Sequence, residues 1–322
     1  MEIDGLTARL RSGLVRLAGL AASLLAAAVV IFVAIDVLPG DPAAVVLGLN
    51  ATPDALAALR SEHGFDQPAP WRFMAWIGAL ARGDFGISTT YRVAVAGLIG
   101  ERLAVSVPLA CLAMGLSLSW GLGLALLAAW QPRFSVVVTA FGEVGLAIPN
   151  FWLGLLLILT FAVGLGMLPS GGFPGWEAGW GALRALILPA IALALPQGAI
   201  IARLALALLN ETLAEVYIRT AEAKGLSRAG VLVRHALPNA MVPLLALMGL
   251  QLSFLLGGSI IVENVFALPG LGRLMAQAIA QHDIITLRAL IFLFAATILI
   301  VHSGVGIVQA SIDPRLRRAS GL

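Results

Sequence analysis

Six long apolar segments constrain this chain more than any other feature. Each has about 20 residues or more, which as a helix is enough to cross the roughly 30 Å of hydrocarbon in a bilayer. Only 11% of the 322 residues are charged and 60% are hydrophobic, whereas a soluble domain has about 25% charged residues. We therefore predict an all-α polytopic membrane protein with six transmembrane helices. The segments are residues 17–38, 105–130, 134–168, 182–209, 238–262 and 286–310.

The first apolar segment follows a short basic N-terminus with Arg9, Arg11 and Arg16. A cleaved signal peptide has a shorter apolar region that ends at a small-residue cleavage site. The length of residues 17–38 favours an uncleaved first span, with the three arginines in the cytoplasm.

Basic residues gather on one side of the predicted protein. With six spans, both termini lie on the same side of the membrane. The segment between spans two and three and the segment between spans four and five lie on that side as well. That side holds 12 of the 20 Lys and Arg residues, and basic residues favour the cytoplasm in short loops. We expect the termini and residues 211–237 to be cytoplasmic. The twelve are Arg9, Arg11, Arg16, Arg133, Arg203, Arg219, Lys224, Arg228, Arg234, Arg315, Arg317 and Arg318.

Residues 39–104 differ in kind from the spans and predict an extracytoplasmic subdomain. A helix start is expected at residues 52–54, and residues 71–82 place apolar side chains on roughly one helical face, with tryptophans suited to a membrane interface. The predicted organisation has three parts. They are the N-terminus with the first span (1–38), this subdomain (39–104), and a five-helix core (105–322) with a cytoplasmic loop at 211–237 and an outer loop at 263–285.

Prolines and ionisable residues interrupt several spans. Pro149 lies in the middle of the third span, where it predicts a kink, and Pro189 and Pro196 predict a tilted or broken fourth span. Glu143 is either a pathway or gate residue or a residue that reaches water at the inner interface. For His302 we favour a neutral side chain bonded to a neighbouring helix.

The motifs of several protein classes are missing from the sequence. The four histidines are scattered, and the chain has no His-Glu-x-x-His, no Gly-x-Ser-x-Gly and no phosphate-binding Gly-x-x-x-x-Gly-Lys-Ser/Thr. A proton-driven transporter would need acidic groups at mid-depth on several spans, and only Glu143 is there. No nucleic-acid-binding face is evident. A stand-alone secondary transporter or channel and an intramembrane enzyme remain as alternatives.

The polar stretch at residues 215–240 resembles a known cytoplasmic loop. Importer permeases of ATP-binding-cassette (ABC) transporters carry Glu-Ala-Ala, three residues, Gly, nine residues, Ile, one residue, Leu-Pro. Ala221, Gly225, Leu237 and Pro238 fall at these spacings.

At three positions the chain departs from that pattern: Arg219, Thr220 and His235 replace Glu, Ala and Ile. The altered form is similar to the peptide and nickel branch of the family, specifically its first ("B") permease. Further segments that resemble this branch are residues 38–42, 64–68, 82–86, 148–152, 262–272 and 312–315.

The resemblance implies a type I ABC importer permease fold in the bacterial inner membrane. It implies a second homologous permease, as a heterodimer, two ABC ATPase subunits and an extracytoplasmic substrate-binding protein. ATP and Mg would bind the partner subunits, and this non-catalytic chain would hold no cofactor or metal. The expected ATPase-coupling residues are Arg219, Thr220, Ala221, Glu222, Ala223, Lys224, Gly225, Leu226, His235, Leu237 and Pro238. The candidates for pathway or gate residues are Glu143, Pro149, Asn150 and Glu263.

The shape of the coupling loop follows from the residues themselves. We expect an L-shaped lever, made of a helix over residues 213–224, a break at Gly225 and a second helix over 228–237. Small residues such as Ala221 and Ala223 would allow close approach of an ATPase to this lever. The alternative is a solvated amphipathic helix on the membrane. The expected cargo is a di- or oligopeptide, with nickel, a metallophore, an opine or glutathione as alternatives.

Overall fold

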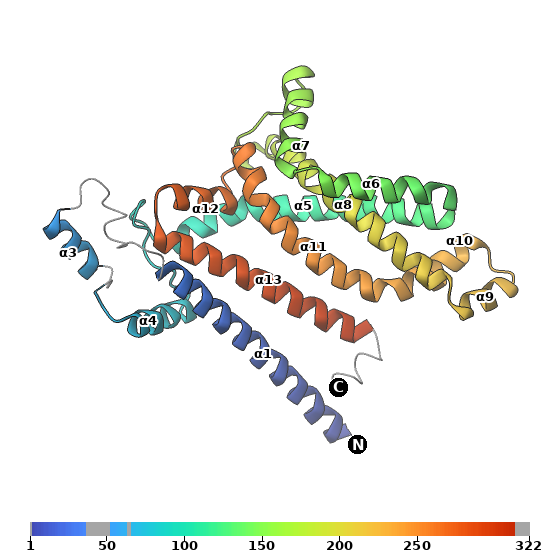
Figure 1. The fold of residues 1–322 in the computed structure, drawn as a ribbon, viewed down its shortest axis with the longest axis horizontal. Helices are drawn as coiled ribbons and strands as arrows, with labels where there is room; N and C mark the ends of the chain where they lie inside the picture. The colour runs from blue at the N-terminus through green and yellow to red at the C-terminus, as the bar shows by residue number, and fades with distance from the viewer. Residues whose placement is uncertain (1, 37–51, 63–65, 313–322) are drawn as a thin grey trace. The chain divides into compact units, whose positions relative to one another are not determined.

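The computed structural model describes residues 2–36, 52–62 and 66–312, and within them the chain is helical, with a single isolated β-bridge between Ile87 and Ala94 (Figure 1). The segments predicted to end the first span (38–42) and to form the basic tail (313–318) lie outside the described residues, as does part of the turn at 63–68. The helices are α1 (Glu2–Asp36), α3 (Pro53–Glu62), α4 (Ala69–Ala81), α5 (Val95–Trp130), α6 (Ser135–Ala147), α7 (Asn150–Leu157), α8 (Trp180–Leu213), α9 (Val216–Ala223), α10 (Arg228–Val231), α11 (Leu237–Val265), α12 (Leu271–Ala280) and α13 (Ile284–Ile312).

The chain packs as two units. One comprises residues 1–12, 106–269 and 301–322, and the other comprises residues 13–105 and 270–300. The helices α1, α5 and α13 run from one unit into the other without interruption. The three-part division predicted from the sequence stays a prediction.

Helix α8 is the central helix of the first unit and packs against α6, α7 and α11. Glycines allow α6 and α5 to approach it closely. A Cβ on Gly145 would lie 2.4 Å from the Cβ of Ala199, and a Cβ on Gly198 would lie 2.3 Å from the indole of Trp120. Such close contacts replace the hydrophobic driving force that is weak between helices in lipid.

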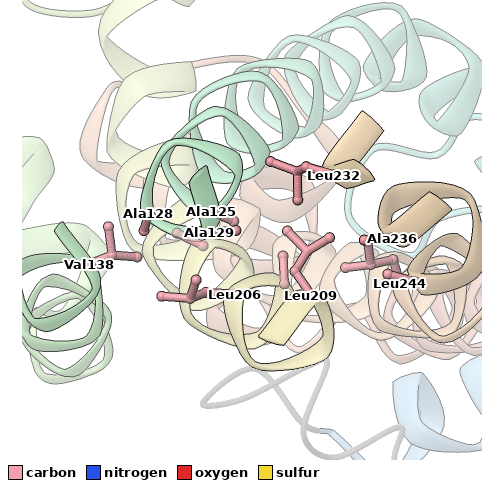
Figure 2. Packing of buried hydrophobic residues seen from close by; sticks show 12 residues of the cluster. Ala125, Ala128, Ala129, Val138, Leu206, Leu209, Leu232, Ala236 and Leu244 are labelled. Carbon is pink, nitrogen blue, oxygen red and sulfur yellow. The ribbon is translucent and has the colours of Figure 1, made fainter. Parts of the chain in front are cut away.

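An apolar cluster joins the inner ends of α5, α6, α8 and α11, as Figure 2 shows. Ala129, Leu209 and Leu232 are buried there, together with Val138 of α6. Because Leu232 belongs to the segment that leads from α10 to α11, this cluster connects the polar loop directly to the membrane helices.

The predicted third span is bent far more sharply than a proline kink requires. The axes of α6 and of α7 with the π-helical turn that follows it (Ile158–Gly164) differ by 97°. The break lies at Ile148, whose ψ of 118° is extended, as favoured for a residue before proline. Neither half is long enough to cross a bilayer alone.

Contacts at both ends place this bent pair between the two ends of α11, as expected of one span. At its start, Val138 of α6 packs in the inner cluster with Leu232. At its end, the Gly172 amide donates to the carbonyl of Phe266 (2.8 Å). Phe266 directly follows α11, at the end of that helix opposite to the inner cluster. With the pair counted once, the described residues contain six candidate spans, as predicted.

The expected break of the fourth span is wrong, because α8 is continuous through Pro189 and Pro196. Proline removes one backbone hydrogen bond, but neighbouring helices can keep a membrane helix intact. Both prolines are buried among such neighbours, whereas Pro149 at the bend of the third span is exposed.

Contacts within the first unit place the end of α13 on the side of the polar loop, and contacts within the second unit set the direction of α1 relative to α13. Gln309 near the end of α13 donates to the carbonyl of Val242 (2.8 Å), near the start of α11. Phe32 in the second half of α1 and Phe292 in the first half of α13 both contact Trp76 of α4, so α1 and α13 run in opposite directions. The basic residues on this side identify it as cytoplasmic.

Candidate functional site

The polar loop is built around a short helix with one buried face. In α9, Ile218 and Ala221 are buried against Val231 of α10, with Leu213 and Leu226 beside them. Because α8 continues to Leu213, α9 begins later than the predicted residue 213.

Gly225 ends α9 in the left-handed region, with φ of +84°. Its amide donates to the Glu222 carbonyl (2.9 Å), and the Leu226 amide donates back to Ala221 (3.3 Å). A glycine adopts this conformation without the steric cost that a Cβ brings. The break predicted at Gly225 is confirmed.

The second arm of the loop is tied to the inner end of α5. The Ser227 hydroxyl caps α10 by accepting from the Gly230 amide (3.2 Å). Arg228 donates to the carbonyl of Ala129 at 3.3 Å. The chain then passes through a π-helical turn (Leu232–Ala236) into α11, with Pro238 in its first turn. This continuous helical path joins the arm to α11.

The free face of α9 lies opposite its buried face. Val216, Arg219, Thr220 and Ala223 are exposed, and they recur at helical spacing on the side away from Ile218. We call these four residues the α9 outer face. Tyr217 and Lys224 flank it on one side and Glu222 on the other, all exposed. Val216 is 77% exposed.

The remaining predicted coupling residues serve the loop itself. Ala221 faces α10, so of the two small residues only Ala223 can bring another surface close to the helix. His235 is half-buried, and its carbonyl accepts from the Asn239 side chain (2.7 Å). Leu237 is half-buried and Pro238 is exposed.

The structure does not bring the four pathway candidates together on one surface. Glu143 is exposed on α6, and Pro149 is exposed at the bend. The amide of Asn150 lies against α11, where a Cβ on Gly258 would come within 2.7 Å of its nitrogen. Glu263 is fully buried, and its carboxylate accepts from the Ser106 hydroxyl (2.6 Å). Their roles stay predictions.

The contact predicted for His302 is present, because its Nε2 lies 3.3 Å from the Ser253 hydroxyl of α11. Among the residues that the structure describes, no three His, Cys, Asp or Glu side chains lie close enough to hold a metal ion.

A buried carboxylate that the sequence reasoning missed organises the outer side of the second unit. Asp283 caps the N-terminus of α13 by accepting from the Thr286 amide (3.1 Å) and hydroxyl (2.8 Å). It also accepts from the Ser88 hydroxyl and from the amide and hydroxyl of Thr89. We call Asp283, Thr286, Ser88 and Thr89 the Asp283 staple, since together they fix the segment before α5 to the start of α13.

The hydrogen bonds also set the ionisation of the staple. Burial by itself would raise the pKa of the Asp283 carboxyl, but the bonds from Ser88, Thr286 and Thr89 outweigh burial and lower that pKa below its usual value. The carboxylate is therefore charged at neutral pH. Its position directly before an apolar run is an N-cap signal that could have revealed it, while its contact with Ser88 is non-local and has no sequence signature.

Two family models together match nearly the whole chain. Residues 121–318 match the model of the family described as "Binding-protein-dependent transport system inner membrane component". Residues 10–110 match the corresponding N-terminal model for membrane components of these systems.

Individual relatives agree with the family matches. The chain is 36% identical over 307 residues to the "Glutathione transport system permease protein GsiC" of Escherichia coli (strain K12), and the alignment covers 94% of this chain and 97% of the relative. The protein of the same name from Shigella dysenteriae serotype 1 (strain Sd197) gives the same identity and coverage.

Proposed function

Since this chain belongs to the family of inner-membrane components of binding-protein-dependent transport systems, we propose that it is the permease subunit of an ATP-driven peptide importer. It forms the translocation path together with a second, homologous permease. It receives substrate from an extracytoplasmic binding protein and energy from two cytoplasmic ABC ATPases. The chain itself is non-catalytic and holds no cofactor, and ATP and Mg bind the ATPases.

The α9 outer face is the docking surface for an ATPase. It combines an exposed apolar residue, Val216, with the small residues Thr220 and Ala223, which allow another helix or groove to approach. The opposite face is anchored on α10, and Arg228 ties α10 to α5. A push on α9 therefore reaches two membrane helices, and this rigid connection is the observation that carries the proposal.

Peptides are the substrate class that we favour. The relatives at 36% identity are named as glutathione permeases, and glutathione is a tripeptide. Glutathione itself is the second candidate, and these names are the observation that favours it. Nickel, a metallophore or an opine remains a more distant alternative within the same class of transporter.

Reconstitution tests the proposal. The chain is purified in detergent with its genetic neighbours co-expressed, and the complex is placed in liposomes with ATP inside and the binding protein outside. We expect the ATPases to co-purify and labelled glutathione or a dipeptide mixture to accumulate only with ATP and binding protein. Uptake without ATP would favour a secondary transporter, and a chain that purifies without ATPases would contradict the proposal.

A further inference from the structure

Two opposite charges lie in the membrane-spanning part of the first unit. Glu143 is eight residues into α6, about 12 Å from its cytoplasmic start, and Arg203 is ten residues before the cytoplasmic end of α8, about 15 Å away along the axis. The two charges therefore stand at similar depths in the inner half of the protein.

The stem of the Arg203 side chain packs against α6 at Gly142. A Cβ on Gly142, the residue before Glu143, would lie 2.7 Å from the Cβ and 3.0 Å from the Cδ of Arg203. The missing side chain of Gly142 thus leaves the space in which the stem of Arg203 lies. Arg203 is half-buried and Glu143 is exposed.

Neither charge has a partner within the part of the chain that the structure describes, for either an ion pair or a hydrogen bond. The exposed residues one helical turn from Glu143 on α6 are Thr139, Ala140, Leu146 and Ala147, of which three are apolar. An unpaired charge facing lipid is costly, so charges inside spans face water or other protein groups. Two unpaired charges of opposite sign at similar depth match a ligand that carries both signs.

We propose that Glu143 and Arg203 line the inner part of the translocation path and contact the ammonium and the carboxylate of a zwitterionic peptide in transit. The inference rests on the proposed function and adds the residues that recognise the ends of the cargo. Glu143 accepts hydrogen bonds from the ammonium, and Arg203 donates two to the carboxylate. A peptide backbone of any sequence offers these groups, so the pair selects for termini and leaves side chains to the binding protein.

Uptake by the reconstituted complex tests this pair with glutathione as the probe. Glu143→Gln keeps the size of the side chain and removes its charge, whereas Arg203→Gln removes the charge and shortens the side chain. We expect each substitution to lower glutathione uptake per ATP hydrolysed about tenfold, because each removes a charge-assisted hydrogen bond to the cargo. Stimulation of ATP hydrolysis by the binding protein should stay unchanged. Glu177→Gln, at an exposed position in the outer loop, is the matched control and should transport like the wild type.

Three results would overturn the inference. Uptake within twofold of wild type in both glutamine variants would show that the charges do not touch the cargo. Loss of binding-protein-stimulated ATP hydrolysis in parallel with uptake in both glutamine variants would show that the two charges act in coupling or assembly and do not contact the cargo. A Glu143→Cys variant in a Cys111→Ser background should react with a charged, water-soluble thiol reagent, and no reaction would show that this face meets lipid.

The labelling experiment needs no transport activity, so it remains decisive if a variant assembles poorly. The wild-type complex separates the two proposals. Absence of ATP-dependent uptake by the wild type overturns the proposed function and this inference together, whereas normal uptake in the wild type and in both glutamine variants overturns this inference alone.

Discussion

Replacement of Asp283 by asparagine should destabilise the outer side of the protein. The side chain accepts five hydrogen bonds, from the Ser88 hydroxyl and from the amides and hydroxyls of Thr89 and Thr286. Asparagine is nearly the same size, so no cavity forms. It loses the charge, and one of its two acceptor atoms becomes an N–H donor.

The magnitude follows from these bonds. A hydrogen bond to a charged group contributes about 1.5–3 kcal/mol and a neutral one about 1 kcal/mol. The Ser88 hydroxyl also accepts from the Tyr91 amide (2.9 Å), so it has little capacity left to accept from an asparagine amide. The longer bond from the Thr89 amide (3.4 Å) contributes least. We expect Asp283→Asn to lower the free energy of unfolding by about 2–4 kcal/mol.

Thermal unfolding of the purified complex in nanodiscs measures this change. Asp84→Asn is the matched control, because Asp84 is exposed and accepts one backbone hydrogen bond, from Gly86 (2.9 Å). At pH 7 the Asp283 variant should melt several degrees below wild type, and the control within about one degree, as expected for a surface change below 0.5 kcal/mol. A melting temperature of Asp283→Asn equal to that of the control would refute the reasoning.

The effect should depend on pH with a definite sign. Since the folded state lowers the pKa of Asp283, the stabilisation is present above the unfolded pKa of about 3.9 and is lost as the pH falls through the folded pKa. The melting difference between wild type and Asp283→Asn should be constant from pH 7 to pH 5 and shrink below about pH 4. A gap that widened on acidification would contradict the assignment of the charge.

Two further predictions concern glycines. Gly198→Ala places a Cβ within 2.3 Å of the Trp120 indole and should lower the free energy of unfolding by about 1–3 kcal/mol, measured in the same melting assay. Gly123→Ala is the control, because a Cβ there would have no atom within 4 Å. Equal melting temperatures of the two variants would argue against tight packing at Gly198. Gly225→Ala forces a Cβ onto a residue with φ of +84°, which costs about 1–2 kcal/mol. The variant should therefore bind the ATPase more weakly in a pull-down. Undiminished binding would show that ATPase docking does not need this turn.

The sequence predicted the number and order of the membrane spans because lipid leaves few choices. Apolar runs of about 20 residues must be helical to satisfy their backbones, and the spans predicted at 238–262 and 286–310 agree within a few residues with α11 and α13. The break at Gly225 was also predictable, since glycine at a helix end has a local cause.

Features that depend on tertiary packing were not predictable from one sequence. Pro149 and Pro196 are both prolines within apolar runs, yet one lies at a 97° bend and the other in a continuous helix. The difference arises from the neighbours that surround each proline. The buried face of α9 likewise depends on contact with Val231, ten residues beyond Ala221.

Cross-linking from the α9 outer face tests the central claim most directly. Val216→Cys in a Cys111→Ser background carries one thiol, at a position that is 77% exposed in the chain alone. In the assembled complex we predict a cross-link from this thiol to an ATPase subunit, with a yield that changes when ATP is added. Glu177→Cys in the outer loop should give none. Failure of Val216→Cys to cross-link in a complex that hydrolyses ATP would contradict coupling through this loop.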